Sequence, residues 1–461
     1  MPYSKVILAS YTYVPKFEID NINDYRHRYT ITSKYKNGPT IKYYKETDTY
    51  FGIPRHALRL TKGMAEEILD DRATGMAIGI AFKGELWDYQ EKAIDEFTSL
   101  VEKGATGFFL ESAPGSGKTV MGLKMISQLK RTTLIVVPKS DLVTQWKDRI
   151  LGTDKIPPFT DLKESDIGIV EGGRCDYVGK KVVIGLIHSV VLKRIATPQF
   201  IKNFGVVLFD ECDSSLPPKT FSSASGMFPA KYRIGMTASA TRADGLHVIF
   251  EDSLAQFRIR CKNTKTLTPS VLLHKFQGSS GHIPSYLKDI QRRGVLISNL
   301  AKNPVRNDLI ADYAFKSFSS GRVTLIMSDR KDQLKSIKDT LVRVYKIDSR
   351  KIGYFVRSID GRLLKKEEKD RSANSATIIL ATYGMMSRGT DIPRLETLIL
   401  GTIRSDMRQT LGRIERFLVG KQAPVVVDIV DTFYIETKNS ARARLKFYNE
   451  RGLRIREVKE K

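Results

Sequence analysis

Short runs of consecutive apolar residues alternate with amphipathic segments through most of the chain. Between residues 83 and 262, apolar runs occupy 133–138, 181–187 and 205–211, and segment 140–150 has the apolar spacing of a helix. A run that is apolar throughout predicts a strand buried on both faces, and strands separated by helices predict a parallel sheet covered on both sides. We therefore expect residues 83–262 to form one α/β lobe.

The same alternation returns between residues 295 and 431, which we expect to form a second lobe. Its apolar runs cover residues 322–328, 351–356, 376–382, 395–400 and 423–430. A chain of 461 residues is too long for one ordinary core, so about three domains are expected. Two α/β units in tandem are the main architectural prediction.

The remaining segments, 1–82, 263–294 and 432–461, differ from the two lobes in residue composition and pattern. Residues 1–82 are rich in Tyr and Thr at alternating polar and apolar positions, which predicts short strands followed by a helical piece near 64–69. This segment is expected to be a small α+β accessory domain. Prolines and glycines in 263–294 predict a connector, and residues 432–461 are a basic tail with an amphipathic helix at 440–452.

Composition narrows the class of protein. Hydrophobic residues make up 41% and charged residues 28%, as in soluble globular proteins. Because no apolar run approaches a membrane span and the start lacks a secretory pattern, a cytoplasmic protein is expected, in the host cytoplasm if a phage encodes it. Three scattered cysteines predict neither disulfides nor a metal site. The net charge of +25 favours a polyanionic partner, although a basic protein tuned for solubility is the plainer interpretation.

A glycine-rich loop carries the strongest local signal. It follows the apolar residues 108–110 and precedes a helical pattern, which is the context that a phosphate-binding loop requires. Lys118 is expected to neutralise the β- and γ-phosphates and Thr119 to offer its hydroxyl to Mg²⁺. The alternative is a glycine-rich turn with an incidental lysine. The residues of this loop that are expected to bind ATP are Ser112, Ala113, Pro114, Gly115, Ser116, Gly117, Lys118 and Thr119.

A pair of carboxylates follows the apolar strand 205–209. Open α/β sheets bind ligands at the carboxyl ends of their strands, which is where Asp210 and Glu211 stand. We expect Asp210 to hold Mg²⁺ and Glu211 to act as the general base on the attacking water. A lone acidic pair after a strand is more often a solvated turn, and the phosphate loop about 90 residues earlier favours the functional reading.

With these two elements in place, the chain resembles the superfamily 2 helicases and translocases over about residues 83–431. The motifs that carry the resemblance are Leu86–Gln90 (L-x-x-Y-Q), Asp210–Asp213 (DECD, near the DExD/H box), Thr237–Ser239, Leu325–Arg330 (motif IV), Ala381–Pro393 (motif V) and Gln409–Arg416 (motif VI). The resemblance implies two RecA-like lobes, adenine recognition by Gln90 and a contact of Asp391 with ATP. It also implies that ATP use is coupled to strand movement by Asp213, Thr237, Ser239 and Gln409.

Two arginines complete the expected catalytic set. Arg413 and Arg416 stand three residues apart, which on a helix places them on one face. The resemblance implies that they act as arginine fingers, which stabilise the charge of the transferring phosphoryl group. The alternative is a surface pair that binds nothing. The catalytic residues are thus expected to be Lys118, Glu211, Arg413 and Arg416.

Nucleic acid is expected to bind at loops that follow strands. Such loops hold phosphates through N–H, hydroxyl and cationic groups and give affinity without reading sequence. The candidates are Lys139, Gly173, Arg174, Ser189, Arg330, Thr382 and Arg388. Residues 1–82 are expected to bind DNA as a domain, while their individual tyrosines are expected to populate half-buried strands.

The leading functional hypothesis is an ATP- and Mg²⁺-dependent DNA helicase, and the short N-terminal domain is similar to that of phage branch-migration helicases of the UvsW type and, more distantly, XPB-like helicases. The resemblance implies action on forked or branched duplexes and single strands, or RNA–DNA hybrids, in recombination, repair or replication, by a monomer. An RNA helicase is the main alternative. A motor subunit of a restriction complex is a third, less favoured because the sequence shows no nuclease metal cluster.

Overall fold

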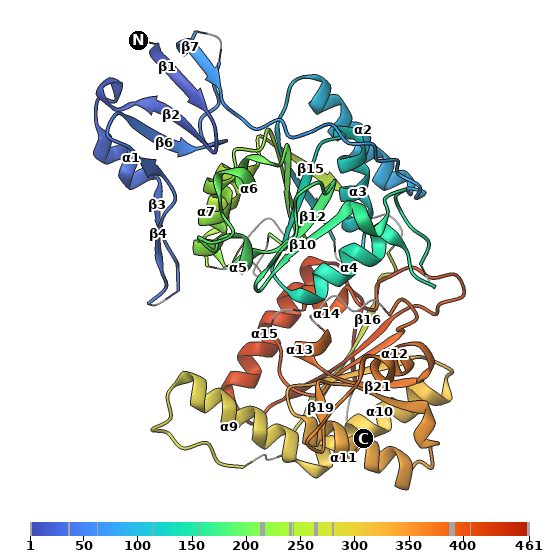
Figure 1. Cartoon of the computed structure of the whole chain (residues 1–461). Helices are drawn as coiled ribbons and strands as arrows, with labels where there is room; N and C mark the ends of the chain where they lie inside the picture. Colours follow the sequence, from blue (N-terminus) through green and yellow to red (C-terminus); the bar gives the residue numbers. More distant parts are fainter. Residues whose placement is uncertain are drawn as a thin grey trace. The chain divides into compact units, whose positions relative to one another are not determined.

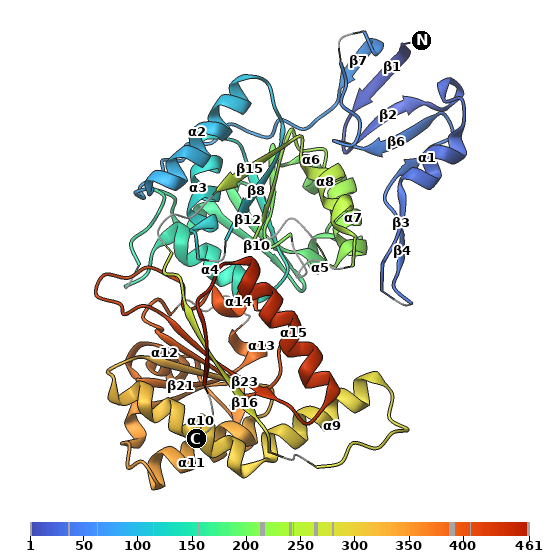
Figure 2. The same cartoon turned by 180° about the vertical axis from the view of Figure 1, so that it is seen from behind.

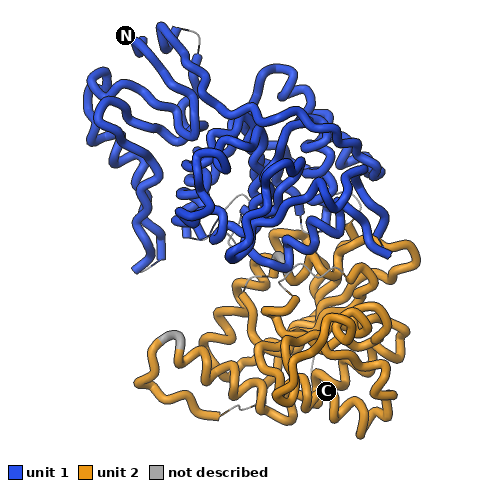
Figure 3. The backbone as a smooth tube through the Cα atoms, viewed as in Figure 1, with its two compact units in different colours: residues 1–264 blue, residues 265–461 orange. Residues whose placement is uncertain are grey.

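The computed structural model describes residues 2–458 except residues 36, 62, 114, 155, 213–216, 239–241, 243, 262–265, 279, 280, 387–391 and 406, and it does not describe the side chains of residues 289, 290, 408 and 409. The chain divides into two compact units, residues 1–264 and residues 265–461 (Figure 3). No helix in the described part of the chain is long and apolar enough to cross a bilayer.

The first unit begins with a small, mostly antiparallel sheet of order β5-β6-β2-β1-β7. Its strands are β1 (Tyr3–Leu8), β2 (Tyr11–Pro15), β5 (Lys45–Glu46), β6 (Tyr50–Pro54) and β7 (Ala65–Asp70). Helix α1 (Ile22–Arg28) leads into a hairpin of β3 (Thr30–Thr32) and β4 (Thr40–Lys42), which extends away from this sheet (Figures 1 and 2). The expected helical piece at 64–69 is wrong. Although AEEILD suits a helix, β7 pairs in parallel with β1, and this tertiary pairing overrides the local preference.

The main sheet of the first unit has the order β11-β10-β12-β9-β13-β14-β8-β15, and all neighbouring pairs except β11–β10 are parallel. Its strands are β8 (Gly107–Ser112), β9 (Thr133–Val137), β10 (Ile167–Glu171), β11 (Arg174–Cys175), β12 (Val182–Leu186), β13 (Val206–Phe209), β14 (Tyr232–Thr237) and β15 (Phe257–Cys261). Every residue of β9 and β13 is buried, as continuous apolar runs predict.

Helices cover both faces of this sheet (Figures 1 and 2). One face packs on α2 (Asp88–Glu102), α3 (Lys118–Leu129) and α4 (Ser140–Leu151). The other face packs on α5 (Ile187–Val190), α6 (Pro198–Lys202), α7 (Pro218–Met227) and α8 (His247–Leu254), and its apolar cluster continues into the small N-terminal sheet.

Two buried arginines fasten the small sheet to the large one. The Arg233 guanidinium on β14 donates to the carbonyl oxygens of Ser10, Ser225, Phe228 and Ser253, each at 2.8 Å. Arg55, just after β6, donates to the carbonyl oxygens of Ala9, Ala230 and Lys231. Burial lowers the pKa of both arginines, and that of Arg233 falls to about 10. Arg233 therefore remains charged at neutral pH, and carbonyl dipoles take the place of water around both guanidinium groups.

The second unit holds a parallel sheet of order β18-β21-β17-β22-β23-β16-β24. Its strands are β16 (Ser270–Phe276), β17 (Thr324–Ser328), β18 (Ile352–Phe355), β21 (Ile378–Thr382), β22 (Thr397–Leu400), β23 (Val425–Asp431) and β24 (Ile455–Val458), and a separate hairpin joins β19 (Ser358–Ile359) to β20 (Arg362–Leu363). Helices α10 (Pro304–Ser319) and α11 (Lys331–Arg343) pack on one face. The other face packs on α12 (Lys366–Ser375), α13 (Tyr383–Met386), α14 (Arg408–Leu411) and α15 (Ile435–Glu450), and α9 (Asp289–Lys302) precedes α10.

The predicted fold class, two α/β lobes with parallel sheets and a small N-terminal domain, is confirmed. The structure differs from the expected connector at 263–294, because β16 lies between β23 and β24 inside the second sheet. It also extends the expected tail helix, since α15 begins at Ile435 and β24 adds an edge strand. Sequence patterns locate strands more easily than they locate the sheet to which a lone strand belongs.

Candidate functional site

Four loops of the first unit leave the same edge of its sheet. The strands β9, β13, β14 and β8 are direct neighbours and run parallel, so they end at one edge; Phe209, the last residue of β13, lies opposite Val136 and Gly235. Lys139, the acidic pair and the glycine-rich loop follow β9, β13 and β8, and Thr237 is the last residue of β14. This is the edge of an open α/β sheet where ligands bind.

The glycine-rich loop is shaped by two left-handed residues. Gly115 has φ 78° and Gly117 has φ 83°, a region that residues with a Cβ seldom adopt. A Cβ on Gly117 would also lie 2.3 Å from Gln90 Nε2, so only glycine fits there. The hydroxyls of Ser112 and Ser116 are hydrogen-bonded to each other beneath the loop. The main chain can therefore turn its N–H groups toward a phosphate at the start of α3.

Helix α2 supports this loop from behind. Gln90 Nε2 and the Tyr89 hydroxyl both donate to the Ser116 carbonyl, at 2.7 and 3.1 Å, while Gln90 Oε1 accepts the N–H of Trp87 at 3.0 Å. Burial raises the pKa of Tyr89, so its hydroxyl keeps its proton and remains a donor. The structure thus places Gln90 against the phosphate loop, where it joins the L-x-x-Y-Q element to the loop.

Lys118 is the first residue of α3 and is almost fully buried. Its ammonium donates to the carbonyl oxygens of Ser112 at 3.2 Å and Ala113 at 3.5 Å, which holds it across the mouth of the loop. An ammonium in this position suits a phosphate oxygen as a further partner. Thr119 follows it on the first turn of α3 and is half-buried.

The acidic pair is held tightly. Asp210 is 4% exposed, and its N–H donates to the Val136 carbonyl at 2.9 Å. Its Oδ1 accepts the N–H of Glu211 at 2.9 Å. Glu211 has φ 53°, a left-handed conformation that costs a non-glycine residue about 1 kcal/mol and that is typical of functional sites. Asp210 and Thr119 supply the oxygen ligands that Mg²⁺ prefers, so these residues fit that ion.

Trp146 was not singled out by the sequence. Its indole Nε1 donates to Asp210 Oδ2 at 2.8 Å, and the side chain is fully buried on α4. Cys212, which follows the acidic pair, is also buried, and its thiol contacts the Phe209 carbonyl oxygen at 3.2 Å. A buried thiol in this position serves packing. No local pattern could have signalled the contact of Trp146 with Asp210, because 64 residues separate the two.

Several predicted residues lie outside the part of the chain that the structure describes. They are Pro114, Asp213, Ser239, Arg388 and Asp391, together with the side chain of Gln409. Thr237, at the end of β14, is described and fully buried.

The predicted nucleic-acid contacts of the first unit occupy two places. Lys139 is half-buried and is the residue before α4. It follows β9, and β9 pairs with β13, the strand that leads to the acidic pair. Gly173 and Arg174 lie in the exposed turn between β10 and β11, where Arg174 pairs with Asp176 at 3.3 Å. Ser189 is buried, and its hydroxyl accepts the N–H of Gly172 at 2.9 Å, so it supports this turn from below.

In the second unit the expected arrangement of Arg413 and Arg416 on one helix is wrong. Helix α14 ends at Leu411, and the N–H of Ile414 donates to the Leu411 carbonyl at 2.9 Å, a turn rather than an α-helical bond. Arg416 lies in an isolated antiparallel bridge with Thr266. The N–H of Leu267 donates to the Glu415 carbonyl at 2.8 Å across this bridge. Both arginines are half-buried.

Lys421 fixes the conformation of this segment. Its ammonium donates to the carbonyl oxygens of Pro393, Ile414 and Arg416, each at 2.8 Å. Burial, together with the positive charge of Arg416, lowers the pKa of Lys421 to about 8, although Glu396 and Glu415 oppose the shift. One side chain therefore joins the end of motif V to the residues of motif VI.

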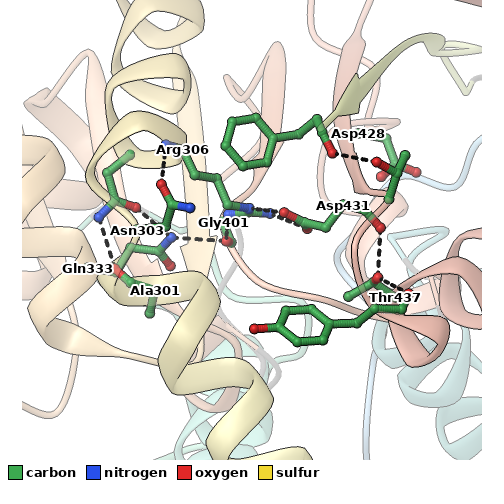
Figure 4. Close-up of polar contacts among 12 residues, drawn as sticks. Ala301, Asn303, Arg306, Gln333, Gly401, Asp428, Asp431 and Thr437 are labelled. Atoms are coloured by element: carbon green, nitrogen blue, oxygen red, sulfur yellow. Dashed lines mark hydrogen bonds and ion pairs between the residues drawn. The ribbon is translucent and has the colours of Figure 1, made fainter. Parts of the chain in front are cut away.

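A buried polar network lies beneath the loops of the second unit. Arg306 on α10 and Asp431 on β23 form a bidentate ion pair, with Nε–Oδ1 at 2.7 Å and Nη2–Oδ2 at 3.1 Å, and Arg306 also donates to the Gly401 carbonyl (Figure 4). Gln333 Nε2 donates to the same carbonyl at 3.1 Å. Arg444 and Asp428 form a second buried pair at 2.8 Å. These pairs fix the chain just ahead of motif VI.

The two remaining predicted contacts follow neighbouring strands. Arg330, after β17, donates to Ser298 Oγ at 3.2 Å and to the Gly294 carbonyl at 3.1 Å, so it holds α9. Thr382 is the last residue of β21 and is half-buried. Its strand pairs with β17 up to Ser328, which places Thr382 and Arg330 at the same sheet edge.

Comparison with known families and chains agrees with this geometry. Residues 83–242 match the family described as type III restriction enzyme, res subunit. A protein of Acanthamoeba polyphaga mimivirus, named as an ATP-dependent RNA helicase, is 26% identical over 457 residues, which are 98% of this chain and 82% of that protein. The DNA 3'-5' translocase XPB2 of Sulfurisphaera tokodaii is 35% identical over 168 residues, 36% of this chain and 34% of that protein.

One solved structure shares this fold with a TM-score above 0.5. A fragment described as an HsdR subunit of a type I restriction enzyme from Vibrio vulnificus aligns with a TM-score of 0.56 at 18% identity, over 82% of this chain and 69% of that one. T4 UvsW aligns over 99% of both chains with a TM-score of 0.39 at 17% identity. The family match and these relatives show that this chain is similar to ATP-hydrolysing helicases of superfamily 2, of the DExD/H type.

Proposed function

We propose that this chain is an ATP-dependent DNA helicase or translocase that unwinds forked DNA or moves branch points in junction DNA. One observation carries the proposal: the phosphate loop, the acidic pair and Lys139 leave neighbouring strands at one sheet edge. A nucleotide and a nucleic-acid backbone bound at adjacent loops of one edge have a short path for coupling.

In this proposal each residue of the nucleotide site has one role. The N–H groups of residues 115–119 and the Lys118 ammonium bind the β- and γ-phosphates, and Glu211 orients and deprotonates the attacking water. Thr119 and Asp210 hold Mg²⁺, which supplies charge neutralisation for the phosphates. Gln90 and Asp391 contact the nucleotide, and Arg413 and Arg416 stabilise the charge that develops on the phosphoryl group. Asp213, Thr237, Ser239 and Gln409 are proposed to couple turnover to strand movement.

The proposed nucleic-acid contacts are sequence-independent. Lys139, the turn of Gly173 and Arg174 that Ser189 supports, and Arg330, Thr382 and Arg388 hold backbone phosphates. Residues 1–82 are proposed to add a DNA contact. Of their side chains, Tyr35 at the end of the β3–β4 hairpin is 59% exposed, whereas Tyr29 and Tyr43 are buried and serve the core.

DNA is favoured by the 35% identity, over 168 residues, to a protein named as a DNA translocase. RNA or an RNA–DNA hybrid is the second candidate, because the relative that spans nearly the whole chain is named as an RNA helicase. Contacts to the phosphates do not by themselves distinguish DNA from RNA, because the two sugar–phosphate backbones differ only in the 2′-hydroxyl group.

The deciding experiment compares matched substrates. ATP hydrolysis by the full chain is measured with DNA and RNA single strands of the same sequence, and strand displacement is measured on forks, four-way junctions and RNA–DNA hybrids. The proposal expects stronger stimulation by DNA and displacement on forks and junctions. Stimulation by RNA alone would select the RNA helicase, and turnover that no nucleic acid changes would reject a motor altogether.

The assembly state is checked separately. We propose that the chain acts as a monomer, whereas the matched family and the HsdR-like fold leave a motor subunit of a restriction complex as an alternative. Gel filtration of the full chain with and without a forked oligonucleotide is expected to give one chain per substrate. An obligate larger assembly would favour the alternative.

A further inference from the structure

Trp146 lies where three functional elements of the first unit meet. It stands on α4, its indole N–H binds the Asp210 carboxylate at the end of β13, and its ring packs on α3. The packing is close, because a Cβ on Gly122 of α3 would come within 3.0 Å of the Trp146 ring. Helix α3 begins with Lys118, so the same side chain touches the helix that carries the phosphate-binding lysine.

The segment that contains Trp146 also holds Asp210 by the main chain. The N–H of Asp210 donates to the carbonyl of Val136 at 2.9 Å, at the end of β9. Lys139 lies between Val136 and Trp146, three residues after the first and seven before the second. Residues 136–146 therefore contact Asp210 twice, through the Val136 carbonyl and the Trp146 indole, and Lys139 lies between these two residues in the sequence.

Two hydrogen bonds orient the carboxylate itself: Oδ1 accepts the N–H of Glu211, and Oδ2 accepts the indole N–H of Trp146. A buried hydrogen bond of this kind is directional and strengthened by its apolar surroundings. A small rotation of α4 would therefore turn the carboxylate rather than merely lengthen a contact.

We propose that Trp146 is a positioning residue that transmits nucleic-acid binding at the start of α4 to the Asp210 carboxylate. The inference rests on the proposed nucleic-acid contact at Lys139. Seven residues of helix span about 10 Å, so a backbone phosphate at Lys139 is two rigid turns from the indole. Binding that shifts α4 changes the orientation of Asp210, and by linkage the nucleotide state changes the affinity for the strand.

The first test observes Trp146 directly. The chain contains only Trp87 and Trp146, so labelling the full chain with 5-fluorotryptophan gives two ¹⁹F resonances that a Trp87→Phe variant assigns. A single-stranded oligonucleotide added without nucleotide is expected to shift the Trp146 resonance, and Lys139→Ala is expected to weaken this shift. A Trp146 resonance that stays unchanged at saturating oligonucleotide would overturn the inference.

The second test separates coupling from folding. Trp146→Phe keeps an aromatic ring but loses the pyrrole part of the indole with its N–H, and it is expected to reduce the stimulation of ATP hydrolysis by oligonucleotide about three- to tenfold, chiefly in kcat. Oligonucleotide affinity measured by anisotropy is expected to change less than twofold. Phe200→Leu is the matched control, because Phe200 is equally buried on α6 among other aromatic rings, and it should leave the stimulation ratio intact.

The outcomes distinguish the inference from the function on which it rests. Full stimulation in Trp146→Phe, with a normally stimulated parent chain, would overturn the inference alone. A parent chain that neither binds nor responds to any nucleic acid would overturn both. If Trp146→Phe does not fold, the ¹⁹F measurement on the Trp87→Phe chain still decides the question.

Discussion

The Lys421 ammonium donates to the carbonyl oxygen of Arg416 at 2.8 Å and thereby connects the last arginine of motif VI to Pro393, the last residue of motif V. The same ammonium binds the carbonyl oxygens of Pro393 and Ile414 at the same distance. Because these three carbonyls come from two separate loops, the lysine determines how the loops meet. The position of Arg416 is thus set by a residue that carries no family motif.

Removing this ammonium is expected to impair turnover more than nucleotide binding. Lys421→Met leaves three buried carbonyls without their donor, and each lost buried hydrogen bond costs about 1–3 kcal/mol locally. We expect kcat for ATP hydrolysis to fall about tenfold or more while KM for ATP changes less. Lys421→Arg, which keeps the charge and the donors, is the control. Equal kcat in the Met variant and the parent chain would show that Lys421 does not position Arg416.

The same lysine predicts a pH dependence. Its pKa is lowered to about 8, so it loses its proton as the pH rises through 8, and a neutral amine has two N–H groups for three carbonyls. We expect kcat to decline above pH 8 in the parent chain. Lys421→Arg stays charged throughout this range, so its profile should remain flat to a higher pH, as measured by phosphate release between pH 6.5 and 9.5.

The nucleotide site predicts a distinction between two substitutions. Lys118→Ala removes the ammonium at the phosphate loop, and Glu211→Gln removes the proposed base; each is expected to lower ATP hydrolysis at least about 100-fold, the range seen when a preorganised catalytic group is deleted. Nucleotide affinity, measured with a fluorescent ATP analogue, should weaken in Lys118→Ala and persist in Glu211→Gln. Substantial hydrolysis by Glu211→Gln would assign the base to another residue.

Asp252 predicts how stability changes with pH in the first unit. The Tyr43 hydroxyl donates to Asp252 Oδ2 at 3.0 Å and links the N-terminal sheet to α8, and burial raises the pKa of Asp252 to about 6. Between the ordinary carboxyl pKa and 6 the folded chain binds more protons than the unfolded chain. The contribution of Asp252 to stability is therefore present at low pH and lost as the pH rises through 6.

Asp252→Asn keeps an acceptor for Tyr43 but cannot ionise. We expect this variant to be more stable than the parent at pH 7.5 and to lose about 1 kcal/mol of that advantage at pH 5, from the shift in pKa. Urea unfolding followed by tryptophan fluorescence reports on the first unit, because Trp87 and Trp146 both lie there. An advantage that is the same at both pH values would contradict the raised pKa.

The sequence predicted those features that are written in local patterns. Continuous apolar runs located the strands of both sheets, and the loop before Lys118 and the acid pair after β13 lie where the patterns indicated. The helix predicted at 64–69 was wrong, because this segment pairs in parallel with β1, about 60 residues earlier, and the pairing decides its conformation. The helix that was expected to carry Arg413 and Arg416 is also wrong, and here too a distant partner is involved, since Arg416 bridges to Thr266, about 150 residues earlier.

Contacts between side chains that lie far apart in the sequence could not be predicted from sequence patterns. Arg233 is a charged residue within an apolar strand pattern, and nothing local indicates that its partners are four carbonyls. Trp146 resembles an ordinary apolar position of an amphipathic helix. Its pairing with Asp210 depends on how α4 crosses the sheet, which only the folded chain reveals.

The ion pair of Arg306 and Asp431 predicts a strongly non-additive response in the second unit. Both side chains are at most 2% exposed, so removing one partner leaves the other as a buried charge (Figure 4). Arg306→Met is therefore expected to destabilise the second unit by about 3–5 kcal/mol. The double substitution Arg306→Met with Asp431→Leu removes both charges and should be less destabilising than Arg306→Met alone. Hydrogen exchange of the β22 and β23 amides measures this unit without relying on tryptophan.

Arg306 also binds the Gly401 carbonyl ahead of motif VI, so the double variant is expected to recover amide protection without recovering full ATP hydrolysis. Recovery of both would mean that Arg306 serves stability alone.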